Sequence, residues 1–484
     1  MKFSDVMKNE AVIKYTENGA VAYDRLNTSL LTLFAQIGSL RSRNEKEIED
    51  KFASAFNEDA LLATKMLFYA GNIRGGLGER RTFRICLHWL AKNHPSIVEK
   101  NIENIAFFNR FDSLFELVDT SCEKMMWKYI SKTLFSDVEK MNNNEPCSLL
   151  AKWMPTETAS SKKTRALARR AISSLHYPAK YYRKTLTALR NYIKVVESQM
   201  SNNDWDYIEY STVPSYAMAR YNNAFNKHDN ERFSKYIEDL NNGKEKVNAS
   251  TLYPYNLVKN YLYNNSDTNM IAEQQWNALP NYIEGKNNII VMADVSGSMI
   301  GRPMETSIGL AIYFAERNKG DYQNCYMTFT DRPHFIKINP NSTLREKVNQ
   351  VRRTDIGYNT NLEAAFNYIL SNATYNNVSN EDMPKALVII SDMEIDRYMR
   401  GHGMGFIDTM KNKFASFGYD LPKLIFWNVE ARNDTYISQS EDVINVSGQS
   451  PSTFKTFIGA LNGKTGWDVM IETLNSKMYD CIKI

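Results

Sequence analysis

The stretch NNIIVMADVSGSM, residues 287–299, decides the fold of the C-terminal part of this chain. A short, nearly continuous apolar run, typical of a strand buried on both faces, is followed at once by three oxygen-bearing side chains at alternate positions, Asp294, Ser296 and Ser298. In open parallel sheets, ligands collect beyond the carboxyl ends of the strands. We therefore expect this segment to be a central strand that ends at a ligand site.

Short apolar runs of this kind recur from residue 286 to residue 484. Further strand-like runs lie at 324–330, 334–338, 385–392, 422–429 and 442–448. Helical stretches lie around 303–318, 343–352, 361–371, 405–416, 452–460 and 467–479. Short buried strands that alternate with helices predict a doubly wound, Rossmann-like α/β domain over residues 286–484.

In the preceding part of the chain, apolar residues recur with a different spacing. From about residue 20 to residue 262, apolar residues recur three and four positions apart, and turn signals separate the segments. This spacing predicts an all-α, HEAT-like solenoid or ring over residues 1–262. In residues 263–285 the helical spacing of apolar residues ends and Asn becomes more frequent, which predicts a linker or a junction. A length of 484 residues agrees with two domains.

Composition excludes several classes of protein. No apolar run approaches the roughly 18–20 residues of a membrane helix, and the beginning MKFSDVMKNEAVIKY is too polar for a signal peptide. Five scattered cysteines form no CxxC pair, and six histidines form no HxxxH pattern, which argues against zinc and redox sites. We expect a soluble, cytoplasmic monomer without a membrane partner.

Two distant segments add oxygen ligands to the first strand end. Asp392 ends the run LVIISD, and Thr360 precedes a helix in DIGYNTNLEAAF. Carboxylates and hydroxyls together suit Mg²⁺ or Mn²⁺ better than zinc. The candidate metal ligands are Asp294, Ser296, Ser298, Thr360 and Asp392. An alternative for the first loop is that Ser296 or Ser298 only caps the helix that begins near residue 303.

The segments DVSGSM, Thr360 and Asp392 resemble, in order and spacing, the metal-ion-dependent adhesion site of the von Willebrand factor A domain. The resemblance implies that the first loop supplies Asp294 and the two serines, the second loop Thr360, and the third loop the Asp392 carboxylate. It also implies a coordination position left for an acidic residue of a partner. Asn361 departs from the family, in which many relatives carry Asp after the Thr.

A strongly basic segment lies in the helical part. Residues 152–194 contain eleven Lys and Arg against one acid, Glu157, which favours a polyanionic partner. A second cluster flanks the turn RGGLGER. The candidate RNA contacts are Lys162, Lys163, Arg165, Arg169, Arg170, His176, Lys180, Arg183, Lys184, Arg190, Arg74, Arg80 and Arg81. The alternative is that these residues only form solvated helix faces.

Several motifs of the helical part, among them LFYAGNIRGGLGERRTF, AKWMPTETASSKKTRALARR and VPSYAMARYNNAFNKHD, resemble the Ro-like family. That family joins a TROVE-type helical module to a C-terminal von Willebrand factor A domain, and the motifs are closest to its bacterial, phage and plant branch, usually described as of unknown function. The resemblance implies a ring that binds small structured RNAs on its outer basic surface and single-stranded 3′ ends of misfolded RNAs in its hole.

Three classes of function follow from these residues and resemblances. The leading hypothesis is a non-enzymatic RNA-binding protein that carries Mg²⁺ in its A domain. The second is an adaptor whose metal site grips an acidic protein partner, and an exonuclease is one partner to consider there. The third is a metal-dependent nuclease, which the sequence favours least because Glu394 and Asp396 are the only further acids near the expected site.

Overall fold

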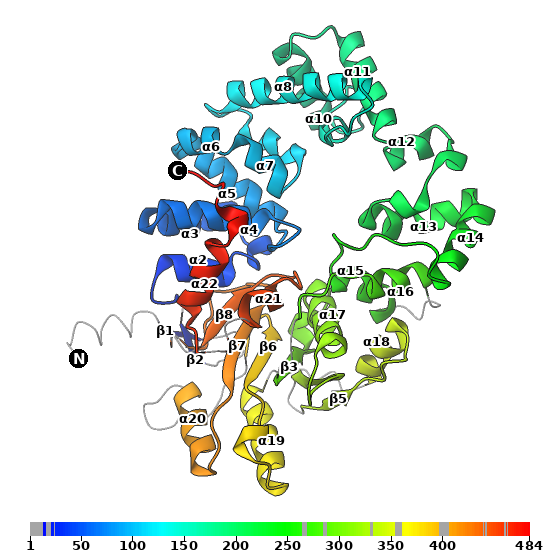
Figure 1. Ribbon diagram of the computed structural model, residues 1–484. Helices are drawn as coiled ribbons and strands as arrows, with labels where there is room; N and C mark the ends of the chain where they lie inside the picture. Colours follow the sequence, from blue (N-terminus) through cyan, green and yellow to red (C-terminus); the bar gives the residue numbers. More distant parts are fainter. Residues whose placement is uncertain are drawn as a thin grey trace.

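The computed structural model describes residues 13–15, 21–23, 25–263, 269–283, 288–329, 333–353, 361–395, 406–438, 440, 443–458, 461 and 463–484. An arc of helices leaves a C-terminal α/β domain on one side and returns to it on the other (Figure 1). The helices α2 to α7 stack along one limb, α8, α10 and α11 cross the far end, and α12 to α16 lead back.

The arc is built from short and medium helices with brief connections. Their bounds are α2 (Ser29–Gln36), α3 (Glu45–Glu58), α4 (Ala60–Gly71), α5 (Arg80–Asn93), α6 (Pro95–Lys100), α7 (Ile102–Phe108), α8 (Glu123–Asn142), α9 (Leu150–Trp153), α10 (Lys162–Ser174), α11 (Ala179–Tyr192), α12 (Val196–Ser201), α13 (Ser215–His228), α14 (Asn230–Asn241), α15 (Pro254–Leu262) and α16 (Met270–Asn277). The 3₁₀ turns η1 (Leu40–Ser42), η2 (Phe111–Leu117), η3 (Trp205–Tyr207) and η4 (Tyr210–Thr212) lie between them.

Local sequence signals set the beginnings of several of these helices. The side chains of Asn44, Asp59 and Ser161 accept hydrogen bonds from backbone N–H groups in the first turns of α3, α4 and α10. Such N-caps satisfy donors that the helix itself leaves unpaired, and each stabilises a helix by about 1 kcal/mol. Short polar residues in the connections therefore decide where one helix ends and the next begins.

The α/β domain carries a six-stranded sheet in the order β5-β4-β3-β6-β7-β8. The strands are β3 (Ile289–Asp294), β4 (Cys325–Phe329), β5 (Phe335–Lys337), β6 (Ala386–Ser391), β7 (Lys423–Asn428) and β8 (Ile444–Ser447). All neighbours are parallel except β4 and β5, so an antiparallel strand forms one edge. The helices are α17 (Arg302–Arg317), α18 (Leu344–Arg353), α19 (Leu362–Tyr375), α20 (Phe406–Ser416), α21 (Thr453–Ile458) and α22 (Gly466–Leu474), with the 3₁₀ turns η5 (Gly297–Met299), η6 (Asn380–Asp382) and η7 (Lys477–Tyr479).

The two faces of the sheet pack into different cores, since successive strand residues point to opposite sides. Ile290 and Met292 of β3 pack with Phe366 of α19 and Phe414 of α20. The alternate residue Val291 belongs to a larger core that also contains Phe68 of α4 and Trp127 of α8. One apolar core therefore runs from the helical arc into the α/β domain.

Two glycines allow the ends of the arc to approach this domain closely. A Cβ on Gly38, just after α2, would lie 2.6 Å from the carbonyl oxygen of Ser447 at the end of β8. A Cβ on Gly309 of α17 would lie 3.0 Å from Cβ of Pro254, where α15 begins. Backbone therefore packs on backbone at both junctions, and no larger residue fits at Gly38 without a shift.

The structure confirms the fold class predicted from the sequence. Each of the six predicted strand runs forms a strand, and the predicted α/β helices correspond to α17 to α22. The helical prediction missed a short antiparallel hairpin, β1 (Ile13–Tyr15) and β2 (Val21–Tyr23), which joins the α/β domain through paired backbone hydrogen bonds of 2.8 and 2.9 Å between Tyr23 and Tyr436. The domain boundaries stay a prediction, and the expected junction contains α16.

Two further expectations concern cysteines and membranes. The five cysteines are free, and Cys86, Cys122 and Cys325 are buried. Within the described ranges, no helix combines the length and the apolarity needed to cross a membrane.

Candidate functional site

The carboxyl edge of the sheet brings most of the predicted metal ligands together. Asp294 is the last residue of β3, and Asp392 directly follows β6. These strands are adjacent and parallel, with Ala293 opposite Ile390, so both carboxylates emerge at the same edge. Ser296 and Ser298 lie in the turn after β3, with their Oγ atoms 3.1 Å apart.

Hydrogen bonds hold the Asp294 carboxylate in place. Its Oδ1 accepts from the backbone N–H of Ser296 at 2.9 Å, and its Oδ2 accepts from the hydroxyl of Ser391 at 2.6 Å. Asp294 has no exposed surface, and Ser296 and Asp392 are each 1% exposed. Both carboxylates are therefore shielded from water, and hydrogen bonds fix the orientation of the Asp294 carboxylate.

The electrostatics of this pair favour a cation. Burial first, and then the neighbouring Asp392 carboxylate, raise the pKa of Asp294 to about 7. A hard divalent ion would offset the repulsion between the two carboxylates, and the hydroxyls of Ser296 and Ser298 are suitable additional oxygen donors. No group of three or more His, Cys, Asp or Glu that could hold a metal occurs in the described residues, so the candidate set depends on hydroxyls.

The structure describes only part of the second loop of the predicted metal site. Thr360 lies outside the described residues. Asn361, the departure from the A-domain pattern, is the N-cap of α19, and its Oδ1 accepts from the N–H of Ala364 at 2.8 Å. Asn caps a helix as well as Asp does, which gives a structural reason for this residue.

Sequence reasoning missed Arg432, which lies at the same edge. Its Nη2 is 3.5 Å from Oδ2 of Asp392 and donates to the carbonyl oxygen of Ser298. Nearby, Glu394 is 1% exposed and accepts from Nδ2 of Asn433 at 3.2 Å. The signal was available, because NVEARND follows a predicted central strand and therefore begins at the ligand edge.

The basic residues of α10 and α11 divide into two groups. Three guanidinium groups make internal contacts. Arg165 donates to the carbonyl oxygens of Ala159 and Ser160, Arg190 donates to those of Ala151 and Met154, and Arg170 pairs with Glu123 and Asp119. The exposed group contains Lys162, Lys163, Arg169, His176, Lys180, Arg183 and Lys184. In that group, Arg183 lies 3.8 Å from Glu157.

The second predicted cluster also makes contacts within the protein. Arg74 donates to the carbonyl oxygen of Phe107, and Arg81 donates to those of Arg41 and Arg43, although Arg74, Arg80 and Arg81 are exposed. The guanidinium groups of Arg74 and Arg81 therefore tie α5 and the turn before it to neighbouring segments, and both side chains remain exposed.

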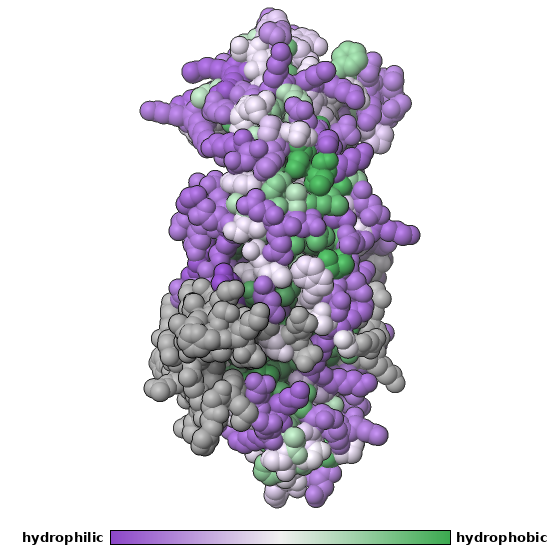
Figure 2. Space-filling model, turned by 90° about the vertical axis from the view of Figure 1, so that its left-hand side faces the viewer, coloured by the Kyte–Doolittle hydropathy of each residue, from purple (hydrophilic) through white to green (hydrophobic). Residues whose placement is uncertain are grey.

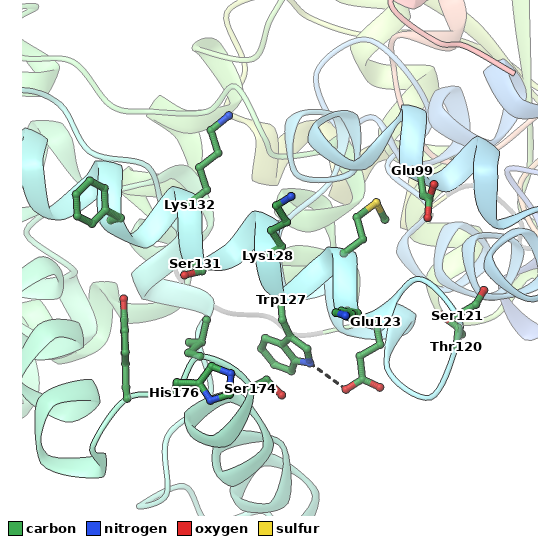
Figure 3. A pocket seen from close by; sticks show the side chains of 15 residues that line it. Glu99, Thr120, Ser121, Glu123, Trp127, Lys128, Ser131, Lys132, Ser174 and His176 are labelled. Atoms are coloured by element: carbon green, nitrogen blue, oxygen red, sulfur yellow. Dashed lines mark hydrogen bonds between the residues drawn. The ribbon is translucent and has the colours of Figure 1, made fainter.

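A groove of about 1360 Å³ lies between α8 and the end of α10, and we call it the α8 groove. Lys128 and Lys132 project from the same side of α8, and Ser174 and His176 lie on a turn at the other side of that helix (Figure 3). The lining of the groove includes Lys124, Lys128, Lys132, Phe135, His176 and Tyr177. The three lysines are exposed, and none of them has an ion-pair partner within the described part of the chain.

The α8 groove combines positive charge with aromatic surface. Phe135 is 63% exposed, and Tyr177 packs edge to face on Tyr181. Two acidic residues line the groove. Glu123 forms an ion pair with Arg170, whereas Glu99 is exposed. The sequence signal was the spacing of Lys124, Lys128 and Lys132, which puts three ammonium groups on one helix face.

Comparisons with known proteins agree with this architecture. The family model "Domain of unknown function (DUF2828)" matches residues 16–110 and 124–289, and "Domain of unknown function (DUF7788)" matches residues 288–477. Uncharacterized protein L728 of Acanthamoeba polyphaga mimivirus is 29% identical over 491 residues, covering 93% of this chain and 85% of that protein.

A solved structure has a similar fold over most of the chain. The Deinococcus radiodurans RO (RSR) protein matches with a TM-score of 0.50 and 13% identity, over 92% of this chain and 99% of that one. At this identity the likeness shows the fold alone, which is Ro-like. Because the DUF2828 model covers more than half of the 484 residues, the chain belongs to the family "Domain of unknown function (DUF2828)".

Proposed function

We propose that this protein is a non-catalytic RNA-binding protein of the Ro-like kind, which binds small structured RNA or the single-stranded end of a misfolded RNA. The observation that carries the proposal is the α8 groove, where three lysines without ion-pair partners in the described residues lie in one lining with the exposed Phe135 and the half-buried Tyr177. RNA offers phosphates to the lysines, and its unpaired bases stack on aromatic rings.

The surroundings of the groove support the same ligand. α11 packs against α8, so the exposed basic residues of α10 and α11 belong to the same end of the arc. Figure 2, which views one side of the molecule, shows a mostly hydrophilic upper part there, with apolar patches at its junction with the part below. A basic surface with local apolar and aromatic patches suits RNA better than a purely polar anion.

A salt-dependent binding measurement tests the proposal. A fluorescent hairpin with a single-stranded 3′ tail is titrated with the full-length chain at several salt concentrations. The triple variant K124E/K128E/K132E should bind about 100-fold more weakly at roughly 0.1 M salt, with a shallower salt slope. A matched control, K319E/K337E/K411E, makes the same change of net charge at exposed lysines of the α/β domain. Equal loss in both variants would refute the α8 groove as the binding site.

The proposal includes a Mg²⁺ or Mn²⁺ ion at the carboxyl edge of the sheet. Asp294, Ser296, Ser298 and Asp392 would hold it, and its charge would neutralise the two buried carboxylates. We assign no catalytic step to this site. Turnover of RNA that disappears in D392A would contradict the non-catalytic proposal.

The adaptor hypothesis retains one supporting observation. Ile300, two residues after Ser298, is 70% exposed beside the candidate metal loop. A partner with an acidic side chain next to an apolar one would fit a metal ion flanked by this isoleucine. Binding of such a partner should be lost with chelator or with D294A and should be unaffected by K124E/K128E/K132E.

A further inference from the structure

The loop after β7, residues 429–436, joins the candidate metal site to the helical arc, and we call it the strap. On the metal side, the Arg432 guanidinium contacts the Asp392 carboxylate and the Ser298 carbonyl oxygen. On the arc side, the Arg432 carbonyl oxygen accepts from Arg43, and the N–H of Ala431 donates to the carbonyl oxygen of Ser39 at 3.0 Å. The side chain and the backbone of Arg432 thus contact two different parts of the molecule.

Further contacts fasten the strap to α2, η1 and α3. Oδ1 of Asp434 accepts from Nε2 of Gln36 at 3.1 Å, and Oδ2 of Asp434 lies 2.8 Å from Nζ of Lys51. Arg41 donates to the Val429 carbonyl oxygen at 2.7 Å and lies 3.0 Å from the Glu430 carboxylate. The strap is therefore bound to the arc along most of its length.

Arg432 contacts the carboxylate that a divalent ion at this site would need as a ligand. The Arg432 Nη2 lies 3.5 Å from Oδ2 of Asp392, while the Asp392 side chain is buried. A metal ion ligated by Asp392 would place two positive groups against each other at a buried position, where repulsion is stronger than in water. The guanidinium side chain is 37% exposed, so it has room to swing into solvent.

We propose that Arg432 is a built-in cation of this site: its guanidinium neutralises Asp392 in the metal-free protein, and a divalent ion displaces it. Displacement loosens the strap where Ala431 meets Ser39, so metal occupancy weakens the attachment of α2 and α3 to the α/β domain. Coupling of this kind is reciprocal, and a firmly docked strap therefore lowers metal affinity. The inference rests on the metal site of the proposed function and goes beyond it by assigning a competitor and a structural response.

Metal binding to full-length variants tests the competition. Mn²⁺ is titrated into wild-type protein and into R432A, R432Q and R432K, with free Mn²⁺ followed by electron paramagnetic resonance. R432A and R432Q should bind about 2- to 5-fold more tightly than wild type, the factor expected for release of one partly exposed ion pair, and R432K should stay near wild type. R232A is the matched control, because Arg232 also contacts a carboxylate and backbone carbonyls, and its side chain is 41% exposed.

Hydrogen exchange of the Ala431 N–H supplies a second readout, measured on wild type and on R432A. Mn²⁺ should speed exchange of the Ala431 N–H in wild type, whereas R432A should exchange quickly with or without the ion. A Mn²⁺ affinity of R432A equal to that of wild type would overturn the competition, and unchanged exchange at Ala431 on metal binding would overturn the loosening of the strap. Either result would leave the metal site standing. If no form of the protein binds millimolar Mn²⁺, the metal site itself is refuted, and this inference with it.

Discussion

The hydroxyl of Ser391 donates a 2.6 Å hydrogen bond to Oδ2 of Asp294, which links the carboxyl ends of the adjacent strands β6 and β3. We expect S391A to lower Mn²⁺ affinity about 10-fold, because a ligand held by an outer partner loses its orientation when that partner is removed. Electron paramagnetic resonance titration measures the change. S391T keeps the hydroxyl and should bind nearly as wild type does, and equal affinity of S391A and wild type would contradict the prediction.

Arg169 and Arg170 are neighbours in sequence but should have different roles. Arg169 is exposed, whereas Arg170 pairs with Glu123 and Asp119. R169E should weaken RNA binding and reduce the salt slope by about 1, without a change in stability. R170A should lower the free energy of unfolding by on the order of 0.5–1 kcal/mol. RNA anisotropy and urea unfolding distinguish the two, and identical profiles for both variants would contradict the assignment.

Asp434 should make the stability of the junction between the strap and the arc depend on pH. Burial alone would raise its pKa, but Lys51 and then Arg43 hold the pKa of Asp434 below its ordinary value. Its ionised form therefore stabilises the fold above about pH 4, and this contribution is lost as pH falls through the lowered pKa. D434N should reduce the free energy of unfolding by on the order of 1–2 kcal/mol at pH 7.

The difference in free energy of unfolding between D434N and wild type should shrink steadily below about pH 4, because the wild-type carboxyl is then protonated and carries no charge. Urea unfolding at several pH values checks this prediction. D420N, at an exposed carboxylate of the α/β domain, is the control. A difference in free energy of unfolding that stayed constant from neutral to acid pH would show that the lower stability of D434N does not come from the lost charge.

The Gly38 junction should tolerate no side chain. A Cβ there meets the Ser447 carbonyl oxygen at 2.6 Å, and backbone atoms cannot move aside as a flexible side chain can. G38A should lower the free energy of unfolding by about 1–3 kcal/mol, the usual cost of overpacking. G466A, where the added Cβ meets atoms at ordinary distances of 3.6 Å and beyond, is the control for urea unfolding and should be nearly neutral.

The α/β half was predictable because each strand carries its own signal. Runs such as KALVIISD are apolar on both faces, which only a covered sheet explains, and Asp294 and Asp392 follow such runs directly. The place of Arg432 near the ligand edge could be predicted from the strand run before it. Its contacts could not, because its partners Asp392 and Ser298 are 40 and 134 residues away in sequence. The basic segment of residues 152–194 shows the same limit. Composition identifies eleven basic residues there, but only contacts separate Arg169 from Arg170.

The two backbone junctions at Gly38 and Gly309 have a consequence for unfolding. Stacked-helix proteins usually need polar terminal repeats to cover their open ends, and they can unravel from those ends one unit at a time. Here the sheet domain covers both ends of the stack, and a shared apolar core crosses the seam. We therefore expect helical and tertiary signals to melt together in a single cooperative transition.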